Sequence, residues 1–337
     1  MRWKTAQKKA KLKGKIRLAV LTLALILGLL LMAQVVRIAH TLLSPLNQTD
    51  RAYHWDSTFN LNLILLTNPL SLLSYNPTET TIKIIEVPDE TYLEVPGGYG
   101  SWRVGSIYKL GGGKLLKDSL GNFFALPVDG FLEINGKNES QAKDLVDLLR
   151  GNPWSMITLL PNLKTDLTPL ELARFALGLR GVRFDKIYTF NLKDLGLLTD
   201  GTLADGANIL IGDSTKIDGL ITKNFTERKI VDEAATIGVF NATSQPGLAG
   251  KSAELISHLG GNVIIQTSLD PDSIGVDDQV WKTIVFGDKP YPYTIKRLKQ
   301  IFTGSCEAEK DCAILGASVS SADDFSRAQV SLILGQK

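Results

Sequence analysis

The stretch Thr80–Gly113 decides how this chain folds, and it reads T-T-I-K-I-I-E-V-P-D-E-T-Y-L-E-V-P-G-G-Y-G-S-W-R-V-G-S-I-Y-K-L-G-G-G. Its first part, Thr81–Val87, is rich in β-branched residues and alternates in polarity, as strands do. Pro88 interrupts that run, and a second short extended run follows at Thr91–Val95. We therefore predict two strands joined by a tight connection, after which glycine and aromatic residues lead into a helix.

Three charged side chains emerge where these predicted strands end, at Asp89, Glu90 and Arg103. If this chain carries chemistry, charged side chains at the ends of strands are where we expect it, so the three residues form the candidate site. Histidine catalysis is not expected, because His258 falls near the end of an amphipathic helix, where we predict that it faces solvent. No motif for a resident metal ion or cofactor is present, and none is expected.

Beyond this stretch, the helix predicted over Leu167–Leu179 has a clear start. It begins T-P-L-E, where Thr168 is placed to cap the first turn and Glu171 lies three residues on. The glycine- and aspartate-rich segment Gly196–Asp213 is predicted as a long loop that holds one short strand at Ile209–Ile211.

The order of predicted elements indicates the fold class. Strands and helices alternate, and strand–helix–strand occurs twice after Ala234. We predict an α/β (α+β) protein with a larger domain over residues 58–232 and a smaller α/β sandwich domain over residues 234–337.

The amino-terminal residues predict a membrane anchor. Residues 1–17 hold eight lysines and arginines and no acid, and the nineteen residues of Leu18–Val36 are apolar except for Thr22 and Gln34. At ~1.5 Å per residue this run matches a hydrocarbon core of ~30 Å. A basic flank stays in the cytoplasm. We predict a cytoplasmic tail (1–17), one transmembrane helix in the cell membrane, a stalk (37–57) and extracytoplasmic domains; a cleaved signal peptide is the alternative.

Net charge argues against one class of partner, and the two cysteines suggest a disulfide. The net charge of +2 combines the basic tail with a mildly acidic remainder, which does not suit nucleic acid. The two cysteines, Cys306 and Cys312, flank a short polar turn, and an oxidising exterior would let them form a disulfide. Two unpaired thiols are the alternative. The oligomeric state is left open.

The segment Thr236–Val263 carries the first family resemblance. It reads T-I-G-V-F-N-A-T-S-Q-P-G-L-A-G-K-S-A-E-L-I-S-H-L-G-G-N-V. A hydrophobic strand, an Asn, a polar turn, P-G-L-A, a helix and a glycine before the next strand make it similar to the carboxy-terminal domain of LytR-type cell-envelope proteins. The resemblance covers roughly residues 234–337.

The preceding region resembles the LytR-CpsA-Psr catalytic domain. The matching segments are F-N-L-N-L-I-L-L (59–66), I-K-I-I-E-V-P-D-E-T-Y-L-E-V-P-G-G-Y-G (82–100), S-I-Y-K-L-G-G (106–112) and P-N-L-K-T-D-L-T-P-L-E-L-A-R-F-A (161–176). The resemblance implies an enzyme that transfers polyprenyl-pyrophosphate-linked glycopolymer onto peptidoglycan outside the membrane. It also implies Mg²⁺ and several arginines that grip the pyrophosphate.

The chain departs from that family where phosphate would bind. The loop T-N-P-L-S (67–71) lacks the family's Asp and Arg, and Val87-Pro88-Asp89-Glu90 stands where the family has Ile-Pro-Arg-Asp. Between Gly136 and Pro161 the only arginine is Arg150. Carboxylates at an arginine position would repel pyrophosphate unless a metal intervened.

We therefore expect a non-catalytic LytR-CpsA-Psr-like domain that acts in cell-wall assembly by binding a wall glycopolymer, peptidoglycan or a protein partner. One alternative is a diverged transferase, with Arg103 as the surviving phosphate contact and Asp89 or Glu90 as a Mg²⁺ ligand. Another is a transmembrane regulator whose basic tail contacts anionic lipid or nucleic acid.

Overall fold

The computed structural model describes residues 53–134, 141–151, 162–268, 283–287, 290–302 and 327–335, and most residues from 20 to 34. Residues 51–337 form one compact unit, and the residues before them a second. The predicted domain boundary near residue 234 therefore stays a prediction. The predicted Cys306–Cys312 disulfide lies outside the described residues.

The predicted membrane span Leu18–Val36 lies partly outside the described residues. Those described between 20 and 34 are helical, and their leucines are exposed. Within the part of the chain that the structure describes, no helix is both long enough and apolar enough to cross a membrane.

A six-stranded mixed sheet organises the larger part of the compact unit. Its strand order is β7-β6-β1-β2-β3-β8. Antiparallel pairing joins β1 to β2, β2 to β3 and β6 to β7, whereas β1/β6 and β3/β8 are parallel. The strands are β1 (Leu61–Leu65), β2 (Leu70–Asn76), β3 (Thr81–Val87), β6 (Gly130–Ile134), β7 (Leu163–Thr165) and β8 (Ile187–Asn191).

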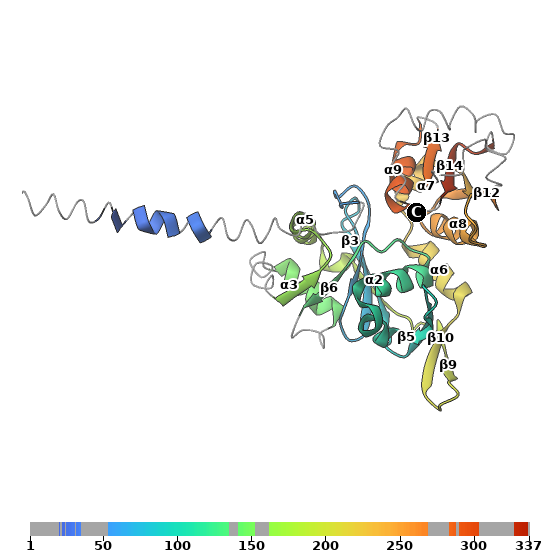
Figure 1. Ribbon diagram of the computed structural model, residues 1–337, viewed down its shortest axis with the longest axis horizontal. Coiled ribbons are helices and arrows are strands. Elements are labelled where there is room, and N and C mark those ends of the chain that lie inside the picture. Colours follow the sequence, from blue (N-terminus) through green and yellow to red (C-terminus); the bar gives the residue numbers. More distant parts are fainter. Residues whose placement is uncertain are drawn as a thin grey trace, which may run out of the picture. The chain divides into compact units, whose positions relative to one another are not determined.

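Helices cover both faces of this sheet because its central strands are apolar on both sides. In β1, Leu63 packs into a core with α3 (Ala142–Gly151) and α5 (Pro169–Leu179). The next residue, Ile64, packs into a second core with α2 (Val104–Phe124) and α6 (Ser214–Asn224). Figure 1 shows α3 and α5 on one side of the sheet and α2 and α6 on the other.

The helix starts follow from local sequence to different degrees. In α5 the predicted capping box is confirmed, since the Thr168 hydroxyl accepts from the Glu171 N–H and the Glu171 carboxylate accepts from the Thr168 N–H. The helix predicted to follow the glycine and aromatic residues is α2. It runs through a kink at Gly111 and Gly112, which have non-helical backbone angles.

A second, four-stranded sheet has the order β5-β4-β10-β9. The long loop predicted over Gly196–Asp213 is wrong there, because ten of its residues form an antiparallel hairpin. Ile209 and Leu210 are buried while the opposing strand stays mostly open to solvent, so only one arm of the hairpin carries an apolar signal. The strands are β4 (Thr91–Val95), β5 (Gly100–Arg103), β9 (Leu198–Thr202) and β10 (Asn208–Gly212).

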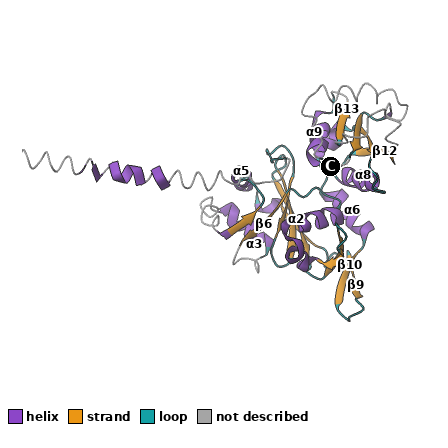
Figure 2. Cartoon of the chain, viewed as in Figure 1, coloured by secondary structure: helices purple, strands orange, loops and turns teal. Residues whose placement is uncertain are grey.

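A third sheet, with the order β12-β11-β14-β13, is built only from residues after 235 (Figure 2). Here β14, which follows the other three strands in sequence, lies between β11 and β13. The elements are α7 (Arg228–Glu233), β11 (Thr236–Asn241), α8 (Leu248–His258), β12 (Asn262–Ser268), β13 (Ile284–Gly287), α9 (Pro292–Ile301) and β14 (Val330–Leu334).

A buried ion pair joins α9 to the start of α7. Arg297 Nη2 lies 2.6 Å from Glu227 Oε1, and the two side chains are 0% and 1% exposed. The Tyr293 hydroxyl donates to the other oxygen of Glu227 at 2.8 Å. The Arg297 guanidinium also lies 5.0 Å from the centre of the Phe59 ring, which extends the cluster to the segment before β1.

Candidate functional site

A tight turn positions the two carboxylates of the candidate site. Pro88 ends β3, and the Thr91 N–H donates to the Pro88 carbonyl oxygen at 2.9 Å, so Asp89 and Glu90 occupy the two central positions of the turn. Both residues are exposed. The structure thus brings them to the end of a buried strand, as the sequence predicts.

The Asp89 carboxyl group faces the first turn of α2. The Gly105 N–H donates to the Asp89 carbonyl oxygen at 3.2 Å. A Cβ on Gly105 would lie 3.0 Å from Asp89 Cγ, so glycine permits this close approach. Partial burial and the charge of Glu90 raise the pKa of the Asp89 carboxyl. The raised pKa favours the neutral, protonated form of this side chain.

Arg103, the third residue of the predicted site, is hydrogen-bonded to the protein's own backbone. It pairs with Tyr92 across β4 and β5, and its Nη2 donates to the Asn208 carbonyl oxygen at 2.7 Å. Its Nε is buried from solvent and has no hydrogen-bond partner within the described ranges. Of the donors in this guanidinium, one therefore holds β10 and another is closed to a ligand.

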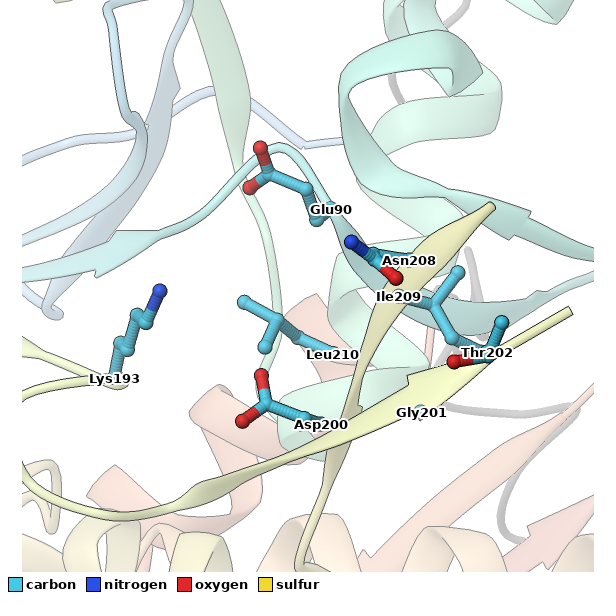
Figure 3. A pocket seen from close by; sticks show the side chains of 8 residues that line it. All are labelled: Glu90, Lys193, Asp200, Gly201, Thr202, Asn208, Ile209 and Leu210. Atoms are coloured by element: carbon cyan, nitrogen blue, oxygen red, sulfur yellow. The ribbon is translucent and has the colours of Figure 1, made fainter. Parts of the chain in front are cut away.

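The nearest pocket has a volume of about 430 Å³ and lies over β9 and β10. Figure 3 shows the lining residues Glu90 on the turn before β4, Asp200 and Thr202 on β9, and Asn208 and Leu210 on β10. Lys193 is the one basic side chain in the lining, against the two acids Glu90 and Asp200. Neither Asp89 nor Arg103 lines it. This lining suits hydroxyl and amide groups better than pyrophosphate.

The residues present do not fit the Mg²⁺ that the family resemblance implies. Asp89 and Glu90 do not converge, since only Glu90 lines the pocket. Within the described ranges, neither carboxylate belongs to a group of three acidic or imidazole side chains close enough to share an ion. Mg²⁺ needs oxygen ligands in near-octahedral geometry, and no step through this ion is derived.

Sequence reasoning missed the pocket residues on β9 and β10 because it placed them in a loop. It also missed a polar group at Glu133, which is 7% exposed. The Tyr108 hydroxyl donates to Glu133 Oε2 at 2.7 Å, and Lys164 Nζ lies 3.4 Å from the same oxygen. The segment S-I-Y-K-L-G-G, which contains Tyr108, was the available signal.

Two curated relatives support a family for this chain. A polyisoprenyl-teichoic acid–peptidoglycan teichoic acid transferase named TagU, from Halalkalibacterium halodurans, is 27% identical over 163 residues, which are 43% of this chain and 53% of that protein. The protein of the same name from Bacillus licheniformis is 32% identical over 82 residues, which are 24% of this chain and 26% of that protein. These TagU proteins belong to the LytR-CpsA-Psr family. These matches support the chain as a LytR-CpsA-Psr family member.

The identity to these relatives is modest, and the alignments span about half and about a quarter of their lengths. No protein-family model matches the chain. Among solved structures, Bacillus subtilis TagT is 13% identical, with a TM-score of 0.38 and coverage of 62% of this chain and 94% of that one. Bacillus subtilis TagV is 12% identical, with a TM-score of 0.39 and coverage of 60% and 98%. Scores this low carry no inference about function.

The names of the relatives and the geometry of the candidate site point in different directions. The relatives are named as teichoic acid transferases. In this chain the turn between β3 and β4 holds Asp89 and Glu90, and the nearby Arg103 is hydrogen-bonded to Asn208. The frame of the candidate site was predictable from sequence, and the engagement of Arg103 was not.

Proposed function

We propose that this family member acts in cell-wall assembly by binding a wall glycopolymer, without transferring it. The hydrogen bond from Arg103 to the Asn208 carbonyl oxygen carries the proposal, because it engages the guanidinium that a transferase would use to bind pyrophosphate. The acidic turn and the pocket lining point the same way, since Glu90 and Asp200 outnumber Lys193. Sugar hydroxyls, which both donate and accept, are compatible with such a lining.

A diverged transferase is the second candidate, and the printed names of the relatives favour it. It requires several basic groups free to bind pyrophosphate in the transition state. Near the candidate turn, Lys193 lines the pocket and Arg103 holds the backbone. A transferase would therefore depend on rearrangement of the β4–β5 hairpin.

We also propose that the chain is anchored in the cell membrane by Leu18–Val36, with residues 1–17 in the cytoplasm and the carboxy-terminal LytR-type domain (234–337) outside. The nineteen-residue apolar run and its basic flank support this placement. Protease added to intact cells tests it: the tail should be protected while the residues after 57 are digested.

A turnover assay tests the function. Full-length protein in detergent is incubated with polyisoprenyl-pyrophosphate-linked glycopolymer, peptidoglycan and Mg²⁺, with one of the TagU relatives as the positive control. We expect no transfer by this chain, and retention of the polymer in a pulldown that persists in Asp89→Ala, since Asp89 does not line the pocket. Clear turnover, or failure of the wild-type chain to retain polymer, would overturn the proposal.

A further inference from the structure

Three side chains away from the candidate turn come together between two helices. Asp218 lies on α6, and Glu254 and His258 lie on α8. Residues four apart in a helix share a face, which places Glu254 beside His258. One ligand atom from each of the three residues lies within 4.8 Å of the other two. The cluster thus combines one imidazole with two carboxylates.

The surroundings of His258 settle which of its nitrogens is free. The prediction that it faces solvent is wrong, because the residue is 4% exposed. Its Nδ1 lies 3.0 Å from the Phe124 carbonyl oxygen and 3.2 Å from that of Ala125. Carbonyl oxygens only accept, so Nδ1 carries the proton, and in the neutral ring Nε2 holds a lone pair. Metal-binding histidines are oriented in this way, with the second nitrogen donating to a backbone carbonyl.

The distance from Nε2 to its neighbour also fits a shared ion. His258 Nε2 lies 3.7 Å from Asp218 Oδ1, which is longer than a hydrogen bond. Two ligands bound at ~2.0–2.1 Å to one tetrahedral ion lie about 3.3 Å apart. Asp218 is partly exposed and Glu254 is exposed, so an ion can enter from solvent and the Glu254 side chain can turn to meet it.

We propose that Asp218, Glu254 and His258 bind a divalent transition-metal ion, with Zn²⁺ as the best fit. Imidazole nitrogen and carboxylate oxygen are ligands that Zn²⁺ accepts, whereas Mg²⁺ and Ca²⁺ are bound almost wholly by oxygen. Water completes the coordination on the solvent side. The ion would join α6, which packs on the six-stranded sheet, to α8, which packs on the carboxy-terminal sheet.

Calorimetric titration of the chelator-treated full-length chain with Zn²⁺ tests the site. We expect one ion per chain and binding at least tenfold weaker in each of Asp218→Asn, Glu254→Gln and His258→Asn. Asparagine places an amide where Nδ1 stands and so keeps a donor for the Phe124 carbonyl while it removes Nε2. The matched control is Asp232→Asn, an exposed acid on α7, which should bind as the wild type does. The proposal is overturned if the wild type does not bind Zn²⁺, or if the three variants bind it as tightly as the wild type does.

A second measurement keeps the test valid if the buried His258 cannot be replaced without unfolding. Ligand binding to the folded state raises the unfolding temperature. Zn²⁺ should raise the Tm of the wild type more than that of Glu254→Gln, a variant that should fold because Glu254 is exposed. Mg²⁺ should raise neither. An equal shift by Zn²⁺ in the wild type and in Glu254→Gln contradicts the site.

Discussion

Arg103 donates a hydrogen bond through Nη2 to the backbone carbonyl oxygen of Asn208, at 2.7 Å. The two residues lie on β5 and β10, which are separated in the sheet by β4. The side chain thus reaches over the middle strand and ties the edge of the hairpin to β10. Arg103, whose place in the sequence suggests a phosphate ligand, therefore stabilises the packing of the strands.

Replacing Arg103 should lower stability more than it affects polymer retention. Arg103→Ala removes a hydrogen bond from a charged group and should lower the free energy of unfolding by about 1–2 kcal/mol, measured by denaturant titration. Arg183→Ala is the control, because Arg183 is 79% exposed and should change stability by less than about 0.5 kcal/mol. Unchanged stability together with lost polymer retention would instead assign Arg103 to ligand binding.

Asp89→Asn should stabilise the chain at neutral pH. The pKa of Asp89 is raised in the folded state, so the native chain binds this proton more tightly than the unfolded chain does. Stability therefore falls as pH rises from the ordinary aspartate pKa through the raised one, and stays lower above it. Asp89→Asn has no ionisable group at this position, so its stability does not fall in this way. Because Asp89 is exposed, the gain should be below about 1 kcal/mol.

Unfolding curves of the wild type and Asp89→Asn, recorded across a series of pH values, check this sign. The gain should be present at neutral pH and vanish on acidification below the ordinary aspartate pKa. A gain that grows on acidification would contradict the assignment.

Tyr108 should make stability depend on pH in the alkaline range. Burial, the hydrogen bond to Glu133 and the charge of Glu133 raise the pKa of Tyr108 from 10.0 to about 12. A raised folded-state pKa adds stability that is complete below pH ~10 and is lost as pH rises towards ~12. Tyr108→Phe removes this dependence and, because it leaves Glu133 short of a donor, should cost about 1–3 kcal/mol at neutral pH.

Ultraviolet titration of tyrosinate, with Tyr188→Phe as the control for an exposed tyrosine, measures the Tyr108 pKa directly. Tyr108→Phe should remove a tyrosine that titrates near 12. If the variant instead loses a tyrosine that titrates near the ordinary value, the hydrogen bond to Glu133 does not persist in solution.

Breaking the Arg297–Glu227 pair should be the most damaging single change. Glu227→Gln leaves the fully buried guanidinium without its counter-charge, which costs about 3–5 kcal/mol. The exposed pair of Arg228 and Asp232 is the control, since Arg228→Ala should cost less than about 1 kcal/mol. Denaturant titration compares the two.

The double variant Glu227→Leu/Arg297→Met separates charge from packing. Because an apolar pair removes both buried charges, much of the lost stability should return. A double variant as unstable as Glu227→Gln would mean that the contacts of Arg297 with Phe59 and Gln300 dominate instead.

The strands were predicted best where apolar alternation and proline breaks coincide. The bounds of β3 (Thr81–Val87) and β4 (Thr91–Val95) are those predicted on either side of Pro88. By contrast, the consecutive glycines from 111 concealed α2, because they kink the helix without ending it. Gly113 is also required there, since a Cβ would lie 2.2 Å from the Phe131 ring, a tertiary contact with no local signal.

The chemistry of the candidate site was less predictable than its position. That Asp89 and Glu90 share a turn follows from Pro88 and the strand ends. That Arg103 is bound to Asn208, and that His258 is buried against Phe124, depends on segments more than 100 residues away. Periodicity reports which face of a helix is apolar, but not which neighbour covers the other face.

The central position of β14 has a consequence for the order in which the protein is assembled. β11 (Thr236–Asn241) pairs with β14 (Val330–Leu334), so some ninety residues must be synthesised after β11 before its partner exists. Until then β13 also lacks the strand with which it pairs. Such long-range pairing is slow and leaves strand edges open. While the chain emerges, the edges of β11 and β13 that pair with β14 therefore stay unpaired until β14 has been made.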